Sequence, residues 1–206
     1  MPYSLRPKHG RRALGAVVGA LALGLIGVPA AQAACAPTPT TKAFAAFGDQ
    51  SDYSLAAGGS FETGTPGWTL SGASVVSGNE SFKVHGAADA RSLAINATGT
   101  AASAPFCVAQ EHPTFRLFTR RTSGTWGVLN VKLRWTDERS VSHETVVGSV
   151  TAADTAWHPT VAFNLAPVLG IWNSTQAMTA RIVLDPEDAG GAWAIDDVYV
   201  DPYSRS

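Results

Sequence analysis

The sequence predicts an all-β fold in which short antiparallel strands form a sandwich or a barrel. Apolar and polar residues alternate in several segments, which is the pattern of a strand with one buried face. No stretch of a dozen residues keeps the i, i+3, i+4 apolar spacing of an amphipathic helix. Clusters of Gly, Pro, Asn and Asp separate the alternating segments, for example at 64–67, 78–79 and 185–191. Many short strands with turn signals between them are typical of a sandwich or a barrel.

Six segments are expected to be strands. The clearest, 129–136, places Leu129, Val131, Leu133 and Trp135 on one face. The others are less regular but keep the same period of two. In chain order the six segments are 115–119, 129–136, 141–150, 161–165, 178–184 and 193–200.

The first 33 residues have the organisation of a secretory signal peptide. Residues 1–12 are basic, an apolar run covers 13–28, and Ala31-Gln32-Ala33 is a small-x-small cleavage site. A membrane-spanning helix needs about 20 apolar residues, whereas this run is shorter, rich in Ala and Gly, and interrupted by Pro29. We therefore expect an exported, extracellular protein that begins at Ala34 and has no stable membrane anchor.

The mature chain, 34–206, is expected to be a single domain with one disulfide. It has no low-complexity linker and no repeat, and its two cysteines are Cys35 and Cys107. An even number of cysteines in an exported protein favours a disulfide bond, and closing a loop of this length stabilises by about 4 kcal/mol. Two further interpretations of the leader fit its pattern less well: a twin-arginine signal at Arg11-Arg12 and lipidation of Cys35.

The charge of the mature chain argues against a nucleic-acid partner. The whole chain has a net charge of -1, but the leader holds 4 of the 15 basic residues and none of the 16 acidic ones. The mature chain therefore has 11 basic against 16 acidic residues, a net charge of -5. Binding to duplex nucleic acid requires a strongly basic surface, so we expect no such partner.

Two motifs resemble those of galactose-binding-like β jelly rolls. Residues 58–62 (GGSFE), followed by Gly67-Trp68, resemble the opening of carbohydrate-binding modules of families 4, 9 and 22. Residues 193–200 (WAIDDVYV) resemble the closing strand of these modules, and the whole chain resembles secreted actinobacterial proteins of similar length. The resemblance implies an antiparallel jelly-roll β-sandwich in a secreted bacterial protein, with Trp68, Trp157 and Trp193 at structural positions.

The same resemblance implies a structural calcium ion between the first and last strands. In jelly rolls of this type the Glu after Phe, here Glu62, meets an Asp of the terminal strand, here Asp196 or Asp197. Carboxylate oxygens are the hard ligands that calcium prefers. The alternative is that Asp196 and Asp197 only cap hydrogen bonds at a strand edge.

No catalytic motif is complete. Residues 47–51 (FGDQS) differ from the F-G-D-S nucleophile block of a lipase and esterase family, because Gln50 stands where that chemistry needs Ser. The chain has neither G-x-S-x-G nor H-E-x-x-H, and nothing selects two of its acids as a glycosidase pair. We therefore favour binding over catalysis.

Two groups of side chains are candidates for ligand contact. Trp126 and Trp172 lie in loop-like segments, where stacking on a sugar ring and packing at the rim of the fold fit equally well. The polar faces of three predicted strands carry a basic row with Arg116, Lys132, Arg134 and Arg181. This row fits an anionic glycan, or a solvated face whose cations pair with carboxylates such as Glu144.

Together these observations predict a secreted jelly roll that binds a polysaccharide or a cell-envelope glycan without converting it. A structural or adhesive cell-envelope protein is the alternative, because no enzyme is attached for a binding module to target. A small secreted glycan hydrolase is the third possibility.

Overall fold

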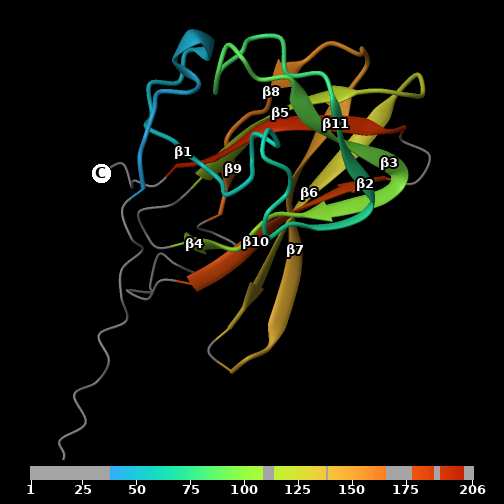
Figure 1. Ribbon diagram of the computed structural model, residues 1–206. Helices are drawn as coiled ribbons and strands as arrows, with labels where there is room; N and C mark the ends of the chain where they lie inside the picture. Colours follow the sequence, from blue (N-terminus) through green and yellow to red (C-terminus); the bar gives the residue numbers. More distant parts are fainter. Residues whose placement is uncertain (1–37, 109–113, 138, 166–177, 188–190, 202–206) are drawn as a thin grey trace, which may run out of the picture. The chain divides into compact units, whose positions relative to one another are not determined.

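A computed structural model describes residues 38–108, 114–137, 139–165, 178–187 and 191–201 of the chain (Figure 1). Within them the regular structure is β, apart from one short 3-10 helix, Ala45–Phe47. The strands are β1 (Ser54–Leu55), β2 (Thr69–Ser77), β3 (Arg91–Ala102), β4 (Phe106–Val108), β5 (Thr114–Arg121), β6 (Gly127–Thr136), β7 (Ser142–Ala152), β8 (His158–Pro159), β9 (Phe163–Asn164), β10 (Met178–Pro186) and β11 (Trp193–Val200). The expected all-β fold is confirmed.

The strands form one antiparallel sheet that curls on itself. Its main path is β7-β6-β10-β3-β11-β5-β8, with the remaining strands as side branches. Strand β3 joins the two halves: Ala102 pairs with Val183 of β10, whereas Ile95 pairs with Trp193 of β11. The half β7-β6-β10 and the half β11-β5-β8 therefore belong to one hydrogen-bonded sheet and enclose the core between them.

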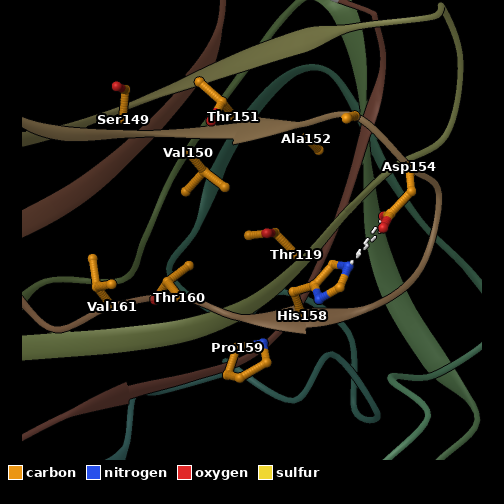
Figure 2. Close-up of a pocket in the computed structure, with 11 residues that line it drawn as sticks. Thr119, Ser149, Val150, Thr151, Ala152, Asp154, His158, Pro159, Thr160 and Val161 are labelled. Carbon is orange, nitrogen blue, oxygen red and sulfur yellow. Dashed lines mark hydrogen bonds and ion pairs between the residues drawn. The ribbon is translucent and has the colours of Figure 1, made fainter.

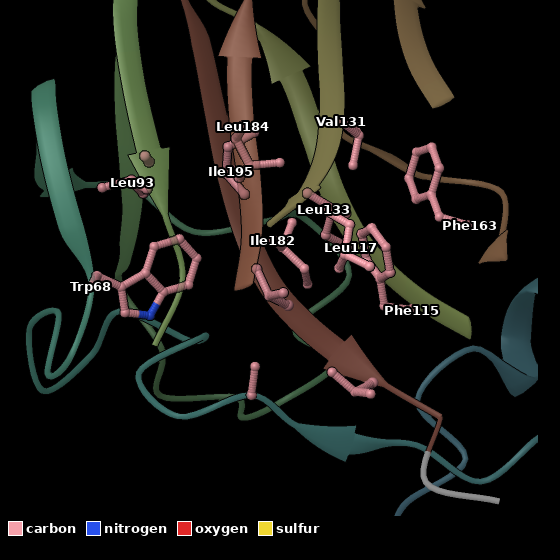
Figure 3. Packing of buried hydrophobic residues seen from close by; sticks show 14 of the residues in the cluster. Trp68, Leu93, Phe115, Leu117, Val131, Leu133, Phe163, Ile182, Leu184 and Ile195 are labelled. Carbon is pink, nitrogen blue, oxygen red and sulfur yellow. The ribbon is translucent and has the colours of Figure 1, made fainter. Parts of the chain in front are cut away.

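The main core follows the alternation of β6. Leu129, Val131 and Leu133 are fully buried, and Leu133 lies opposite Ile182 of β10. Apolar residues of both halves meet there, including Leu93, Phe115, Leu117 and Ile195 (Figure 3). Burying one such side chain contributes about 1.5–3 kcal/mol, so the period-two pattern accounts for the choice of inward face. Trp68, Trp157 and Trp193 are buried, as the motifs predicted.

A second apolar cluster covers the outer face of β5 and β11. It joins Phe44 and Tyr53, from the segment before β2, to Phe118 of β5 and Tyr199 of β11. The rings of Phe44 and Phe118 are stacked with centroids 5.4 Å apart. Both faces of β11 are therefore buried, along its whole length.

Several predictions fall on residues outside the described ranges. These are the signal peptide 1–33, the N-terminus at Ala34, and Cys35, so cleavage and the Cys35–Cys107 disulfide stay predictions. Cys107 itself lies in β4, opposite Thr179 of β10. Among the described residues, no helix has the length and apolarity needed to cross a bilayer.

Candidate functional site

An acidic cluster forms where β11 departs from regular geometry. Asp196 and Asp197 are both fully buried. The β5–β11 register shifts between Asp196 and Tyr199, and Asp197 has a φ of 47°, which is uncommon for a residue other than glycine. In a regular strand consecutive side chains point to opposite faces, whereas at this bulge both carboxylates bind the same loop. The Asp196 carboxylate accepts from Glu80 N at 2.8 Å and that of Asp197 from His85 N at 3.0 Å.

The loop that covers this bulge is organised by a third buried carboxylate. Glu80 is fully buried, and its carboxylate accepts hydrogen bonds from the backbone N–H groups of Phe82 and Val84. The pKa of Asp196 is raised to about 8, mainly by burial and additionally by the charges of Asp197 and Glu80. Burial likewise raises the pKa of Asp197 to about 7, with Glu80 and Asp89 adding to the effect. Because these buried carboxylates repel one another when they are ionised, a bound cation near them would be stabilising.

Three side chains at this place, two carboxylates and one imidazole, lie close enough together to hold a metal ion. One ligand atom each from His85, Asp89 and Asp197 lies within 4.8 Å of the others, and His85 Nδ1 is 2.6 Å from Asp89 Oδ2. Asp197 Oδ1 is buried and has no hydrogen-bond partner among the described residues. A buried oxygen without a partner is costly, so the group could bind a metal through this atom. We refer to Glu80, His85, Asp89, Asp196 and Asp197 as the acidic cluster.

Glu62 does not belong to the converging group, contrary to its predicted role beside Asp196 or Asp197. Its Oε1 instead accepts from Ala90 N at 2.9 Å and Arg91 N at 2.7 Å, so the side chain caps the start of β3. The sequence motif located Asp197 but missed His85 and Asp89, which lie four residues apart in the loop. Only the tertiary contact of that loop with β11 brings them to Asp197.

Arg116 occupies a buried position on the covered face of β5. It is 8% exposed, and its guanidinium lies 2.9 Å from an Asp49 carboxylate oxygen. Arg116 Nε donates to Thr160 O at 2.8 Å, and the guanidinium lies 4.2 Å from the centre of the Phe44 ring. These contacts tie the segment before β1 to the sheet and hold Arg116 away from the surface.

The other three basic candidates share the outer face of β6 and β10. Arg134 and Arg181 are directly opposite each other in the β6–β10 register. Arg134 pairs with Glu144 at 2.6 Å, and Lys132 pairs with both Asp185 and Glu144. Hydrogen bonding to Asp185 is the main cause that raises the pKa of Lys132. Arg181 Nη1 donates to the carbonyls of Gly67 and Ser103. We call Lys132, Arg134, Glu144, Arg181 and Asp185 the strand-face patch, a surface of interleaved cations and carboxylates.

Of the two candidate tryptophans, only Trp126 lies within the described residues. Trp126 is 57% exposed and directly precedes Gly127, which pairs with Ala152 of β7. Its exposure is compatible with contact to a ligand. Trp172 lies outside the described residues.

A pocket of about 380 Å³ lies between the end of β7 and the segment that contains β8 (Figure 2). Two of its lining residues, Asp154 and His158, form a pair, with His158 Nε2 at 3.0 Å and 3.2 Å from the two carboxylate oxygens. The pocket is lined by Thr119, Ser149, Val150, Thr151, Ala152, Ala153, Asp154, His158, Pro159, Thr160 and Val161.

No protein-family model matches the chain, and no curated protein is similar to it in sequence. Solved structures share its fold. One contains a family 22 carbohydrate-binding module and the catalytic module of endo-1,4-β-D-xylanase 10B from Clostridium thermocellum, complexed with xylohexaose. It is 12% identical with a TM-score of 0.52, and the match covers 69% of this chain but only 27% of that one. The other is a family 22 xylan-binding domain of xylanase 10C from Paenibacillus barcinonensis, 16% identical with a TM-score of 0.50 over 71% of this chain and 93% of that one.

The chain has the jelly-roll fold of these modules. The antiparallel jelly-roll β-sandwich that the two motifs implied is therefore confirmed. At these identities the likeness concerns the fold alone, because function depends on the residues of a site.

Proposed function

We propose that the protein is a secreted, non-catalytic carbohydrate-binding protein whose partner is a polysaccharide or a cell-envelope glycan. The observation that carries this proposal is the strand-face patch on a jelly-roll fold. Arg134 offers N–H donors and Glu144 offers acceptor oxygens within 2.6 Å of each other, and Lys132 and Asp185 repeat the arrangement beside them. Sugar hydroxyls both donate and accept hydrogen bonds, so they match a surface on which charged donors and acceptors alternate.

The buried position of the acids favours a binding role over hydrolysis. A glycosidase needs two carboxylates that flank a sugar in a cleft. Glu80, Asp196 and Asp197 instead have no exposed surface, and a backbone N–H group of the overlying loop donates to one oxygen of each of them. We therefore assign these three acids a structural role and not a catalytic one.

A glycan array probed with the mature protein, with and without calcium, tests the binding function. We expect retention of at least one β-linked glycan, and xylohexaose is the first soluble probe for titration. Arg134→Ala should weaken that binding about tenfold or more, since a charged hydrogen bond contributes about 1.5–3 kcal/mol. Arg91→Ala, an exposed arginine at the start of β3, is the matched control. An array without a hit, together with no heat of binding to xylohexaose, would refute the function.

For the acidic cluster, we propose calcium as the bound ion. Asp89 and Asp197 supply carboxylate oxygens, which suit a hard cation, whereas His85 offers an imidazole nitrogen that zinc prefers. An ion held there would link β11 to the loop from Glu80 to Asp89 and so stabilise only the folded state. At 100 times its Kd, calcium would add about 2.7 kcal/mol, which raises Tm by roughly 5–10 °C in a domain of this size.

Melting curves after chelation and after add-back of calcium or zinc test this assignment. Calcium should restore Tm in the wild type but not in Asp89→Asn, and Asp137→Asn, outside the cluster, should behave like the wild type. An unchanged Tm after complete chelation, or restoration by zinc alone, would contradict the calcium assignment.

Export is also part of the proposal. The basic head and the Ala31-Gln32-Ala33 site support cleavage before Ala34, and the even cysteine count supports the Cys35–Cys107 bond. N-terminal sequencing of the exported protein should give Ala34, and thiol titration of the denatured, unreduced protein should find no free thiol. Met1 at the N-terminus or two reactive thiols would disprove the respective step.

A further inference from the structure

We propose that the pocket between β7 and β8 is a subsite for a single neutral sugar ring. The inference rests on the proposed carbohydrate-binding function and assigns one sugar residue to a specific place. The pocket belongs neither to the strand-face patch nor to the acidic cluster, and its lining comes from the end of β7, the inward face of β5 and the segment around β8 (Figure 2).

The pocket begins where the inward face of β5 changes from apolar to polar. Phe115 and Leu117 point into the main core, and the next inward position of β5 is Thr119, which lines the pocket. From the opposite half, Val150 and Ala152 of β7 also line it. If this end of the core served packing alone, we would expect apolar residues on both β5 and β7 here. The hydroxyl of Thr119 instead supplies a polar group at the base of the pocket.

The hydroxyl of Thr119 is available to a ligand. The residue is only 2% exposed, and within the described residues its side chain has no hydrogen-bond partner. The neighbouring Thr160 differs, because its hydroxyl accepts from Leu117 N at 3.2 Å. The hydroxyl is not among the fully buried side-chain atoms that lack a partner, so it keeps contact with solvent, and a hydroxyl of a bound sugar can form a hydrogen bond with it.

The Asp154–His158 pair supplies further hydrogen-bonding groups. Asp154 Oδ1 accepts from Ala156 N as well as contacting His158 Nε2, whereas Oδ2 contacts only His158 among the described residues, at 3.2 Å. Both side chains are more than half exposed, and no hydrogen bond joins His158 Nδ1 to another of the described residues. An acceptor next to a second polar nitrogen matches neighbouring hydroxyls on one ring.

Arg121 holds the turn that carries Asp154. It is 4% exposed and donates to the carbonyls of Ala152 at 3.3 Å and Ala153 at 3.2 Å. Its guanidinium also binds the carbonyls of Ser123 and Gly124, just before the exposed Trp126. Arg121 is thus a positioning residue that fixes one wall of the pocket before a ligand arrives, which reduces the entropy lost on binding.

The size and charge of the pocket select the ligand. A volume of about 380 Å³ lies at the lower end of the range for small-molecule sites, which favours one ring over a long chain. Val150, Pro159 and Val161 present aliphatic surface to the C–H groups of a ring. Among the lining residues Asp154 is the only acid and His158 the only base, so the lining has no Lys or Arg side chain to bind the carboxylate or sulfate of an anionic sugar.

Titration of isotope-labelled mature protein with methyl β-D-xyloside, methyl β-D-glucoside, methyl β-D-galactoside and xylohexaose tests the subsite. We expect amide shifts at Thr119, Val150 and His158 with at least one of these probes. Thr119→Val keeps the shape but removes the hydroxyl, and His158→Gln removes the imidazole. Each should raise Kd at least tenfold, whereas Thr145→Val, on β7 outside the pocket, should leave Kd within twofold.

The outcomes separate the subsite from the function. If the wild type binds a probe, and Arg134→Ala weakens binding while Thr119→Val and His158→Gln do not, the subsite is refuted and the function stands. If the wild type binds no probe and no arrayed glycan, both are refuted. Loss of binding in the two pocket variants, with native dispersion of their spectra, supports the subsite.

Discussion

Asp49→Asn tests whether a partly buried ion pair fastens the segment before β1 to the sheet. The Asp49 carboxylate accepts hydrogen bonds from Ser51 N at 3.1 Å, Tyr53 Oη at 2.7 Å and Arg116 Nη1 at 2.9 Å. The substitution keeps the shape of the side chain but removes its charge. It leaves the buried guanidinium of Arg116 without its carboxylate partner, beneath the aromatic cluster of Phe44 and Phe118.

The expected loss is large for a single isosteric change. Breaking a fully buried pair from one side costs about 3–5 kcal/mol. Because the Asp49 side chain is 19% exposed and the amide retains one acceptor oxygen, we expect about 2–4 kcal/mol. For a domain of this size that lowers Tm by roughly 5–15 °C. Asp52→Asn is the control, because Asp52 pairs with Lys42 at 3.7 Å while both side chains are about half exposed. Such a pair contributes less than about 1 kcal/mol.

Acid unfolding provides a second readout of the same pair. Burial alone would raise the pKa of Asp49, but hydrogen bonds from Ser51, Tyr53 and Arg116 outweigh it and hold the pKa well below its ordinary value of 3.8. A lowered pKa gives stability that is present above the unfolded value and is lost as pH falls toward the folded value. The difference between wild type and Asp49→Asn should therefore be constant from pH 5 to 7 and shrink below about pH 4.

A double-mutant cycle with Arg116→Met decides whether the two residues act together. Urea unfolding at pH 7 should give a coupling free energy of at least about 1 kcal/mol. Additive losses, or a loss for Asp49→Asn no larger than that for Asp52→Asn, would refute the anchoring role of the pair.

Two further substitutions test the packing and the corrected role of Glu62. In Gly148→Ala the added Cβ would meet the Phe163 ring at 2.7 Å. Overpacking should therefore lower the free energy of unfolding in urea by about 1–3 kcal/mol. An unchanged urea midpoint would mean that β7 and β9 can move apart without cost. Glu62→Gln keeps an acceptor for the N–H groups of Ala90 and Arg91. Because Glu62 lies outside the acidic cluster, any calcium-dependent rise in Tm should persist in this variant. Loss of the calcium-dependent rise would mean that Glu62 is a metal ligand after all.

The strands that sequence reasoning found are those with strong apolar contrast. β6, β10 and β11 carry large apolar residues, whereas β2 (TLSGASVVS) and β3 (RSLAINATGTAA) consist mostly of small residues. Small residues give little difference between a buried and an exposed face, so the period of two is faint there. Yet β3 is the strand at which the sheet curls, because it pairs with both β10 and β11. The fold class was accessible from the sequence, but the strand that joins the two halves was not.

The predicted basic row is divided for a similar reason. Alternation places Arg116 on the polar face of its strand, as it does Lys132 and Arg134. The curl of the sheet then puts β5 and β6 in different halves, and the segment before β1 covers the outer face of β5. Arg116 consequently becomes a buried anchor, while Lys132 and Arg134 remain beside Glu144. Periodicity assigns a side chain to a face, but it does not tell what covers that face.

The two adjacent acids of β11 should differ in how replacement by Asn changes stability. The difference distinguishes a carboxylate that only stabilises the bulge, Asp196, from one that binds a metal ion, Asp197. Both oxygens of Asp196 accept backbone N–H groups, from Glu80 and from Asp197, so in Asp196→Asn an amide NH₂ would face a donor. We expect a loss of about 1–3 kcal/mol with or without a metal. Asp197 uses only Oδ2 in this way, because Oδ1 has no partner among the described residues. Asp197→Asn should therefore be tolerated within about 1 kcal/mol in chelator but gain nothing from added calcium. Equal losses for both variants in chelator would mean that Asp197, like Asp196, only supports the bulge, and the metal site would have to be abandoned.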